Sequence, residues 1–149
     1  MNIETAPQRL RTMPSWLLAQ AAIESRRSVG QVLEAQAVHR SQYALLAAIE
    51  EYGPLIQADL SDRSGLDRSD VVRWVDELEG GGLVQRTRDP ADRRRNAVSL
   101  TASGRRRLKQ LDAVLSRAQA DFLKALAPAE QRLLVELLST VLGLPRDNA

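Results

Sequence analysis

The chain of 149 residues contains no cysteine and a single histidine, His39. Disulfides, thiol catalysis and thiol redox sensing are therefore excluded, and a metal site is not expected. The longest apolar run, Tyr43 to Ile49, is far too short to span a bilayer, and the basic N-terminus has no apolar segment of the secretory type behind it. We expect a soluble cytoplasmic protein that needs no metal or other cofactor.

Charge is unevenly distributed along a chain whose length and composition suit one globular domain. Residues 85–109 carry nine basic and two acidic side chains, a net charge of +7. The whole chain has a formal charge of +2, so the other residues sum to −5. A concentrated basic segment on an acidic body favours a polyanionic partner such as nucleic acid, although arginine runs are also found as plain solvated surface.

The spacing of apolar residues predicts helices in the first third of the chain. Pro14 suits the first turn of a long helix over about residues 14–36. Ser41 is expected to cap a second helix, which Gly53-Pro54 ends.

Two short helices around a glycine turn are predicted next. The first covers residues 56–63 and ends at Ser64-Gly65. The second opens at Asp67 or Arg68 and carries an inward apolar face formed by Val71, Val75 and Leu78. Such a pair is a candidate helix-turn-helix.

The apolar period changes from helix to strand after Gly80-Gly81-Gly82. Residues 83–87 and 97–100 are expected to form two short strands joined by a turn-rich basic loop. The result is a hairpin with arginines at its tip. Thr101 then suits the N-cap of a long amphipathic helix that reaches Phe122.

Leucines form stripes both on that helix and on a last one that begins at Pro128 and ends before Gly143. The N-terminal helix is only a partial partner for so much apolar surface. A two-fold dimer that pools the terminal helices would cover it, and packing within one monomer is the alternative.

The segments Asp89–Arg94 (DPADRR) and Val98–Gly104 (VSLTASG) resemble the wing signature of MarR-type transcriptional regulators. The resemblance extends through Ser64–Leu66, Ser69–Arg73 and Gly82–Arg86, and it covers about residues 40–108 closely. It implies a homodimeric winged helix-turn-helix protein that binds palindromic promoter DNA, usually as a repressor released by a small molecule.

The expected fold class is mainly α with a small β-hairpin wing, in a single domain over residues 1–149. Helical dimerisation regions cover about residues 14–40 and 101–143. A DNA-binding lobe covers about residues 41–100 and includes the wing at 83–100.

The second helix of the helix-turn-helix offers Arg68, Ser69 and Arg73 to a major groove, because they lie away from its inward face. This helix carries five acidic and two basic residues, a net charge of −3. Its acidity is a departure from the family pattern. Acids such as Glu77 repel phosphate, so the affinity for DNA is expected to be either modest or unusually dependent on the DNA sequence. Asp67 is interpreted as the N-cap of this helix in preference to a residue that contacts a base.

The wing resemblance implies that Arg94 enters a minor groove and that Asp92 braces the tip, by pairing with Arg94 or with backbone amides. Arg93 and Arg95 are then expected to contact phosphate. Two kinds of partner are considered for Arg105 to Arg107: DNA phosphates, or acidic side chains of a partner subunit.

The family's effector pocket lies between the helical core and the DNA-reading lobe. Its candidate lining residues here are Trp16, His39 and Tyr43, whose rings can stack on a small aromatic or anionic ligand. Each also has a simpler interpretation: Trp16 and Tyr43 as core residues, and His39 as a hydrogen-bonding residue at a helix start.

Two hypotheses follow, and neither is an enzyme, since no phosphate-binding glycine loop, catalytic triad or metal-ligand spacing is found. One is a dimeric, ligand-responsive DNA-binding regulator. The other is a winged-helix module for protein interaction or DNA architecture that has no effector, which the acidic reading helix supports. Arg94→Ala discriminates the regulator from the protein-interaction module, because only the DNA-binding protein should lose DNA affinity.

Overall fold

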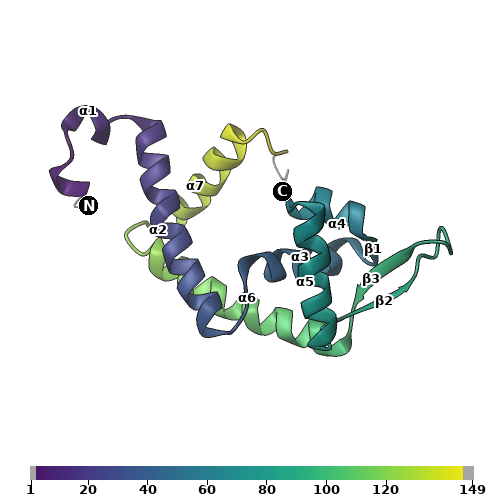
Figure 1. Cartoon of the computed structure of the whole chain (residues 1–149). Coiled ribbons are helices and arrows are strands. Elements are labelled where there is room, and N and C mark those ends of the chain that lie inside the picture. Colours follow the sequence, from purple (N-terminus) through teal and green to yellow (C-terminus); the bar gives the residue numbers. More distant parts are fainter. Residues whose placement is uncertain (1–2, 146–149) are drawn as a thin grey trace.

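The computed structural model describes residues 3–145, which form a helical protein with one small sheet (Figure 1). The short elements are a 3-10 turn, α1 and three strands, and the longer ones are α2 to α7. In chain order they are the 3-10 turn Ile3–Thr5, α1 Gln8–Arg11, α2 Pro14–Ala35, α3 Arg40–Tyr52, β1 Leu55–Ile56, α4 Gln57–Ser64, α5 Arg68–Gly80, β2 Val84–Arg88, β3 Asn96–Leu100, α6 Ala102–Phe122 and α7 Pro128–Val141. The predicted class, mainly α with a hairpin wing, is confirmed.

Helix α3 begins earlier than predicted, because His39 and not Ser41 is its N-cap. The His39 Nδ1 atom accepts a hydrogen bond from the Ser41 amide at 3.2 Å. Gln42 completes the cap, since its Oε1 accepts from the His39 amide at 2.9 Å. The Ser41 side chain is buried within the first turn of the helix. The simpler interpretation of His39, as a hydrogen-bonding residue at a helix start, is thus confirmed, whereas the N-cap assigned to Ser41 is wrong.

The sheet has three strands in the order β1-β3-β2, where a two-stranded hairpin was predicted. Strand β1 pairs antiparallel with β3, with Leu55 opposite Val98. Two residues are too few to show the alternation that identifies a strand in a sequence. Strand β1 ties the base of the wing to the segment between α3 and α4, while the β2–β3 loop extends away from the lobe (Figure 1).

A contiguous apolar core joins α3, α4, α5 and the sheet, and it continues onto α6. The predicted inward face of α5 is confirmed, since Val71, Val75 and Leu78 are all buried. Burial of this face fixes the rotation of α5 and leaves Arg68 and Arg73 exposed on its outer side.

Gly104, in the first turn of α6, lies against the backbone that enters β2. Thr101 caps this turn as predicted, because its Oγ1 accepts from the Gly104 amide at 3.0 Å. The same hydroxyl donates to the Gly82 carbonyl at 2.6 Å. A Cβ added at Gly104 would lie 2.0 Å from the carbonyl oxygen of Leu83. Only glycine lets the strand and the helix approach this closely.

We therefore expect Gly104→Ala to lower the free energy of unfolding by about 1–3 kcal/mol, because backbone must move to admit the methyl group. Urea unfolding followed by circular dichroism measures the loss. Gly30→Ala in α2 is the matched control: nothing lies within 4 Å of its added Cβ, and alanine favours a helix interior by up to about 1 kcal/mol. Equal stability of the two variants would contradict the close approach.

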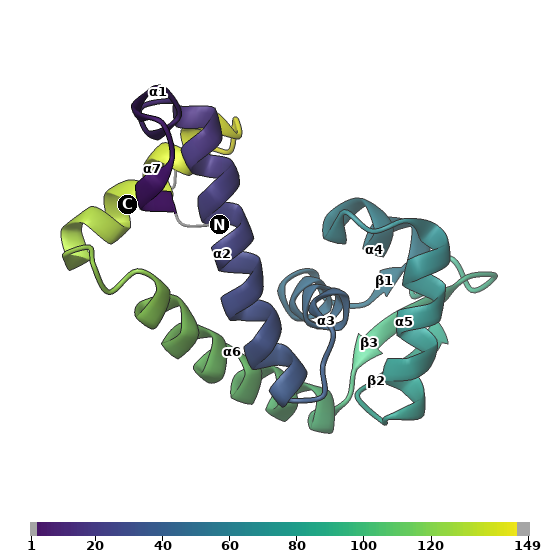
Figure 2. The same cartoon turned by 60° about the vertical axis from the view of Figure 1, so that its left-hand side comes forward.

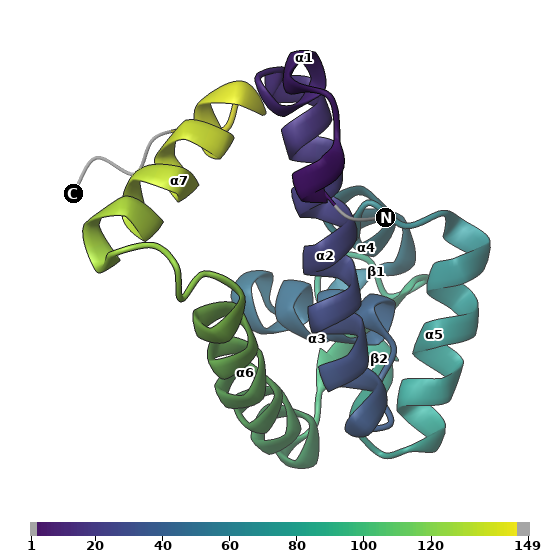
Figure 3. The same ribbon diagram turned by 90° about the vertical axis from the view of Figure 1, so that its left-hand side faces the viewer.

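The terminal helices form an open arrangement, in which α2 packs against α6 and the two helices diverge toward the start of α2 and the end of α6 (Figures 2 and 3). Helix α7 turns away after α6, and none of its residues is buried. Leu133, Leu137 and Val141 follow one another at four-residue spacing and are 51%, 56% and 71% exposed. Leucines 17 and 18 of α2 are also exposed. The C-terminal leucine stripe is thus largely uncovered within one chain.

Candidate nucleic-acid interface

Helix α5, named here the reading helix, presents Arg68, Ser69 and Arg73 to solvent, while its opposite face is buried. Asp67 occupies the N-cap position, but its side chain makes no capping hydrogen bond. The structure thus brings the three residues predicted for the major groove onto one exposed surface. Their contact with DNA stays a prediction.

Arg73 is held in place although its side chain is exposed. One guanidinium nitrogen lies 3.0 Å from Asp70 Oδ1, one turn earlier. The guanidinium carbon also lies 4.5 Å from the ring centre of Trp74, in cation–π contact. Arg73 is therefore oriented by two neighbours before any ligand binds.

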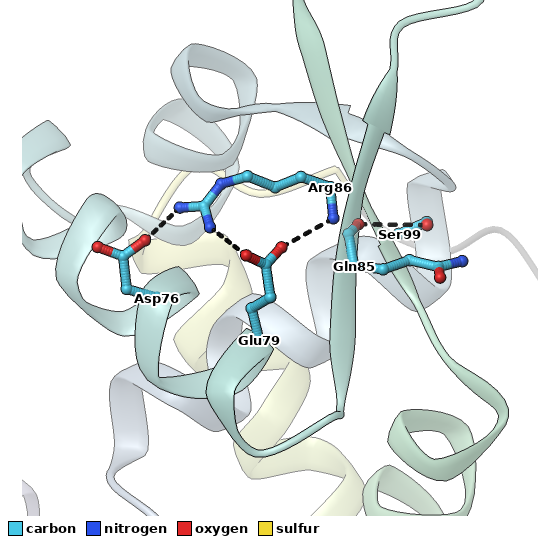
Figure 4. A network of polar contacts seen from close by, with 5 residues as sticks. All are labelled: Asp76, Glu79, Gln85, Arg86 and Ser99. Atoms are coloured by element: carbon cyan, nitrogen blue, oxygen red, sulfur yellow. Dashed lines mark hydrogen bonds and ion pairs between the residues drawn. The ribbon is translucent and has the colours of Figure 1, made fainter.

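Arg86 of β2 binds two acids of the reading helix (Figure 4). Its guanidinium lies 2.5 Å from Asp76 Oδ1 and 2.9 Å from Glu79 Oε1, and its amide donates to Glu79 Oε2 at 3.0 Å. Burial works to lower the pKa of Arg86, but hydrogen bonds and charge attraction from Asp76 and Glu79 outweigh it and raise the pKa. Arg86 thereby joins the wing to the reading helix.

These contacts reduce the negative charge that the acidic reading helix presents to a ligand. In the sequence its acids count as free negative charges, whereas Asp70, Asp76 and Glu79 each have an arginine partner in the fold. Glu77 accepts a hydrogen bond from Gln42 of α3 at 3.4 Å. Internal pairing reduces the repulsion that a phosphate would meet. Sequence reasoning missed Arg86, because no local pattern links β2 to acids seven and ten residues earlier.

The wing loop is organised by its own acids. Asp92 Oδ1 accepts from the Arg94 amide at 3.0 Å, and Asp89 Oδ1 accepts from the Ala91 amide at 2.9 Å. Arg95 lies 3.5 Å from Asp92 and 3.9 Å from Asp89. Arg88 donates to the Arg93 carbonyl at 3.0 Å. These contacts close the loop with side chains of Arg88 and Arg95 turned toward it.

The arginine triplet therefore divides into two kinds. Arg95 pairs with acids of the loop, whereas a phosphate contact was predicted for it from the sequence. Arg93 and Arg94 use only backbone groups in the loop, and within residues 3–145 their exposed guanidinium groups have no ion-pair partner. These two side chains are available to an external anion.

Two of the three arginines at the start of α6 have partners inside the chain. Arg107 hydrogen-bonds the Gln36 carbonyl, just beyond the C-terminus of α2, and Gln36 Oε1 at 3.3 Å. A cation at a helix C-terminus is favourable for the helix dipole. Arg105 lies 3.7 Å from Glu50 of α3. Both residues connect α6 to other parts of the fold.

Of the three residues proposed for an effector pocket, His39 alone lines the hollow between α2 and α3. This hollow has a volume of about 430 Å³, and Trp16 and Tyr43 are absent from its described lining. Trp16 is half-buried near the start of α2. The hollow is lined by Gly30, Leu33, Glu34, Ala37, Val38, His39 and Arg40.

Tyr43 connects α3 to α6, since its hydroxyl donates to Asp112 Oδ1 at 2.9 Å. Burial, then the hydrogen bond and charge of Asp112, raises the pKa of Tyr43 to about 12. The neutral phenol is thus favoured in the folded state.

The unfolded-state value of 10.0 lies below the folded one, so the stabilisation is complete below pH 10 and is lost as the pH rises toward 12. We expect the tyrosinate absorbance of Tyr43 to develop near pH 12 in the wild type. This absorbance is identified as the part of the titration that Tyr43→Phe lacks. Asp112→Asn should move that titration to lower pH, since it removes the charge. Titration of Tyr43 near pH 10 in the folded wild type would contradict this environment.

Other kinds of site find no support in the described part of the chain. No group of three His, Asp or Glu side chains in residues 3–145 could hold a metal ion. Over the same residues, no helix has the length and apolar character needed to cross a membrane.

Comparison with known proteins gives consistent matches. A sequence model of the MarR family matches residues 38–95. The transcriptional regulator HosA of Escherichia coli O111:H- is 30% identical over 104 residues, which are 70% of this chain and 77% of HosA. Curated relatives from Thauera aromatica and Bacillus subtilis are matched over 58% and 62% of their own lengths, so the matched part spans about three fifths of each.

Solved structures match over nearly the whole chain. The PcaV transcriptional regulator of Streptomyces coelicolor, solved with its natural ligand, is 30% identical, with a TM-score of 0.72 over 90% of this chain and 94% of its own. CouR of Rhodococcus jostii RHA1, solved with p-coumaroyl-CoA, is 27% identical, with a TM-score of 0.76 over 91% and 95%.

The three-helix lobe, the three-stranded sheet and the projecting basic hairpin define a winged helix-turn-helix protein. Its relatives are named as transcriptional regulators. The chain belongs to the MarR family.

Proposed function

We propose that this protein is a sequence-specific DNA-binding transcriptional regulator that acts as a homodimer in the cytoplasm and represses genes from a palindromic operator. The observation that carries the proposal is the pairing of the reading-helix acids, which leaves Arg68 on α5 and Arg93 and Arg94 on the wing as exposed, unpaired bases in the described chain. Enzyme activity has no part in the proposal.

In this function the reading helix enters the major groove, where Arg68, Ser69 and Arg73 contact base edges or phosphate. The wing follows the backbone, with Arg94 in the minor groove and Arg93 on phosphate. Asp92 holds the tip through the Arg94 amide. A two-fold dimer places two reading helices about one DNA turn, roughly 34 Å, apart.

A small ligand is proposed to release the DNA, as a single domain with a shared dimer core can couple the two sites. PcaV and CouR, which are 30% and 27% identical, were solved with ligands. The hollow beside His39 combines an apolar lining with Arg40, which suits an aromatic or anionic molecule. Of Trp16, His39 and Tyr43, only His39 is kept as a residue that contacts this ligand.

Selection from a random pool of DNA duplexes at physiological salt tests the function without knowledge of the promoter. We expect enrichment of a two-fold symmetric site that Arg94→Ala binds poorly. Weak, salt-sensitive binding with no enriched site would favour the protein-interaction or architectural alternative. That alternative loses support from the reading helix, since three of its acids are already paired with arginine.

A further inference from the structure

The indole of Trp74 lies between two functional regions of the lobe. Its ring stacks on the imidazole of His39, with 4.4 Å between ring centres and 10° between the planes. The guanidinium of Arg73 lies 4.5 Å from the Trp74 ring centre. Three side chains from α5 and from the start of α3 thus form one connected stack.

Each end of the stack is anchored. The His39 imidazole accepts a hydrogen bond from the Ser41 amide, and the backbone amide of His39 donates to Gln42, so the N-cap of α3 orients the ring. Arg73 is held at its other side by Asp70 at 3.0 Å. Trp74 is half-buried and packs against the core of the lobe. The stack therefore connects a fixed point in the fold to an exposed arginine.

An exposed arginine usually samples many rotamers and loses that freedom when it binds a base. Contacts that orient the guanidinium in advance reduce this loss and restrict the base that the fork can reach. Core packing alone would need only the apolar body of Trp74, and it would not require a cation against the ring.

We propose that Trp74 is a positioning residue for sequence readout, which orients Arg73 and takes its own orientation from His39. This inference rests on the proposed DNA-binding function. It adds a role for Trp74, which would influence sequence specificity by orienting Arg73. Because His39 also lines the hollow between α2 and α3, the stack is a direct physical connection from that hollow to the reading face.

A double-mutant cycle on the selected operator tests the inference. Discrimination is the ratio of affinities for that operator and for a duplex changed at one base pair, measured for each position of the half-site in turn. Arg73→Ala should lower the ratio about 5- to 100-fold. Trp74→Leu should lower it about three- to tenfold, but should have no further effect in the Arg73→Ala background.

Two more variants separate positioning from packing. His39→Asn keeps a good capping residue but removes the stacked ring, so it should reproduce the loss seen with Trp74→Leu. Trp74→Phe retains a ring and should restore most of the discrimination. The salt dependence of binding should be unchanged in the Trp74 and His39 variants, because none of them removes an arginine or a lysine.

The outcomes are distinct. Losses from Trp74→Leu and Arg73→Ala that multiply would overturn the inference and leave the proposed function standing. An Arg73→Ala variant that discriminates like the wild type would also overturn it, because Arg73 would not read a base. A wild type that selects no site at all would overturn the proposed function itself.

Discussion

Replacing Arg93 and Arg94 together by alanine should weaken operator binding by about 1–3 kcal/mol per arginine that touches DNA. The plot of log affinity against log salt should also become flatter by about one unit for each phosphate that the wing no longer neutralises. The wing should keep its shape, because both residues contribute only backbone groups to the loop, through the Arg94 amide and the Arg93 carbonyl. Fluorescence anisotropy over a salt series measures both quantities.

Arg11→Ala is the control for this change. Arg11 ends α1 and is exposed at the far side of the molecule from the wing (Figure 1). Arg95→Ala is a second comparison, since it removes the ion pairs with Asp89 and Asp92 and should loosen the loop itself. A double variant with the affinity and salt slope of the wild type would mean that the wing does not touch DNA.

The second large effect concerns α7. Sedimentation of the wild type should give twice its chain mass of 16.5 kDa, as expected for a dimer. Leu137→Glu combined with Val141→Glu should shift the measured mass toward that of the monomer. These side chains are 56% and 71% exposed in one chain, and burying such a residue contributes about 1.5–3 kcal/mol. Two carboxylates in the same contact would add a desolvation cost.

Val72→Glu on the reading helix is the matched control, since Val72 is also exposed but lies away from the terminal helices. It should remain dimeric at the same concentration. Operator binding should fall with the loss of the dimer, because half-sites are then occupied independently. A wild type that is monomeric at micromolar concentration would contradict the proposed shared core.

The pairing of acids and bases on the lobe explains why a net-negative reading helix is compatible with DNA. Asp76 and Glu79 bind Arg86 from the wing side, so they hold the two DNA-reading elements together. Arg68 and, at the wing tip, Arg93 and Arg94 stay exposed and have no ion-pair partner among residues 3–145. Net charge of a helix is thus a poor measure of the charge that a phosphate meets.

Most elements of this fold could be predicted from the sequence, because their signals are local. Pro14 and Thr101 begin helices α2 and α6 through contacts within one turn, and Gly53 and Gly65 end helices α3 and α4. The inward face of α5 follows from the helical period of its valines. The wing hairpin follows from turn residues between two short strands. The resemblance to a known family adds expected roles for Arg94 and Asp92.

Contacts between distant segments could not be predicted in the same way. The stack of His39 on Trp74, the bridge from Arg86 to Asp76 and Glu79, and the short strand β1 all depend on how separate elements meet. The spacing of apolar residues along the sequence does not predict these contacts, because they depend on the packing angle and rotation of whole helices. The sequence therefore determines which residues face outward, and the tertiary contacts determine which of their charges are available to a ligand.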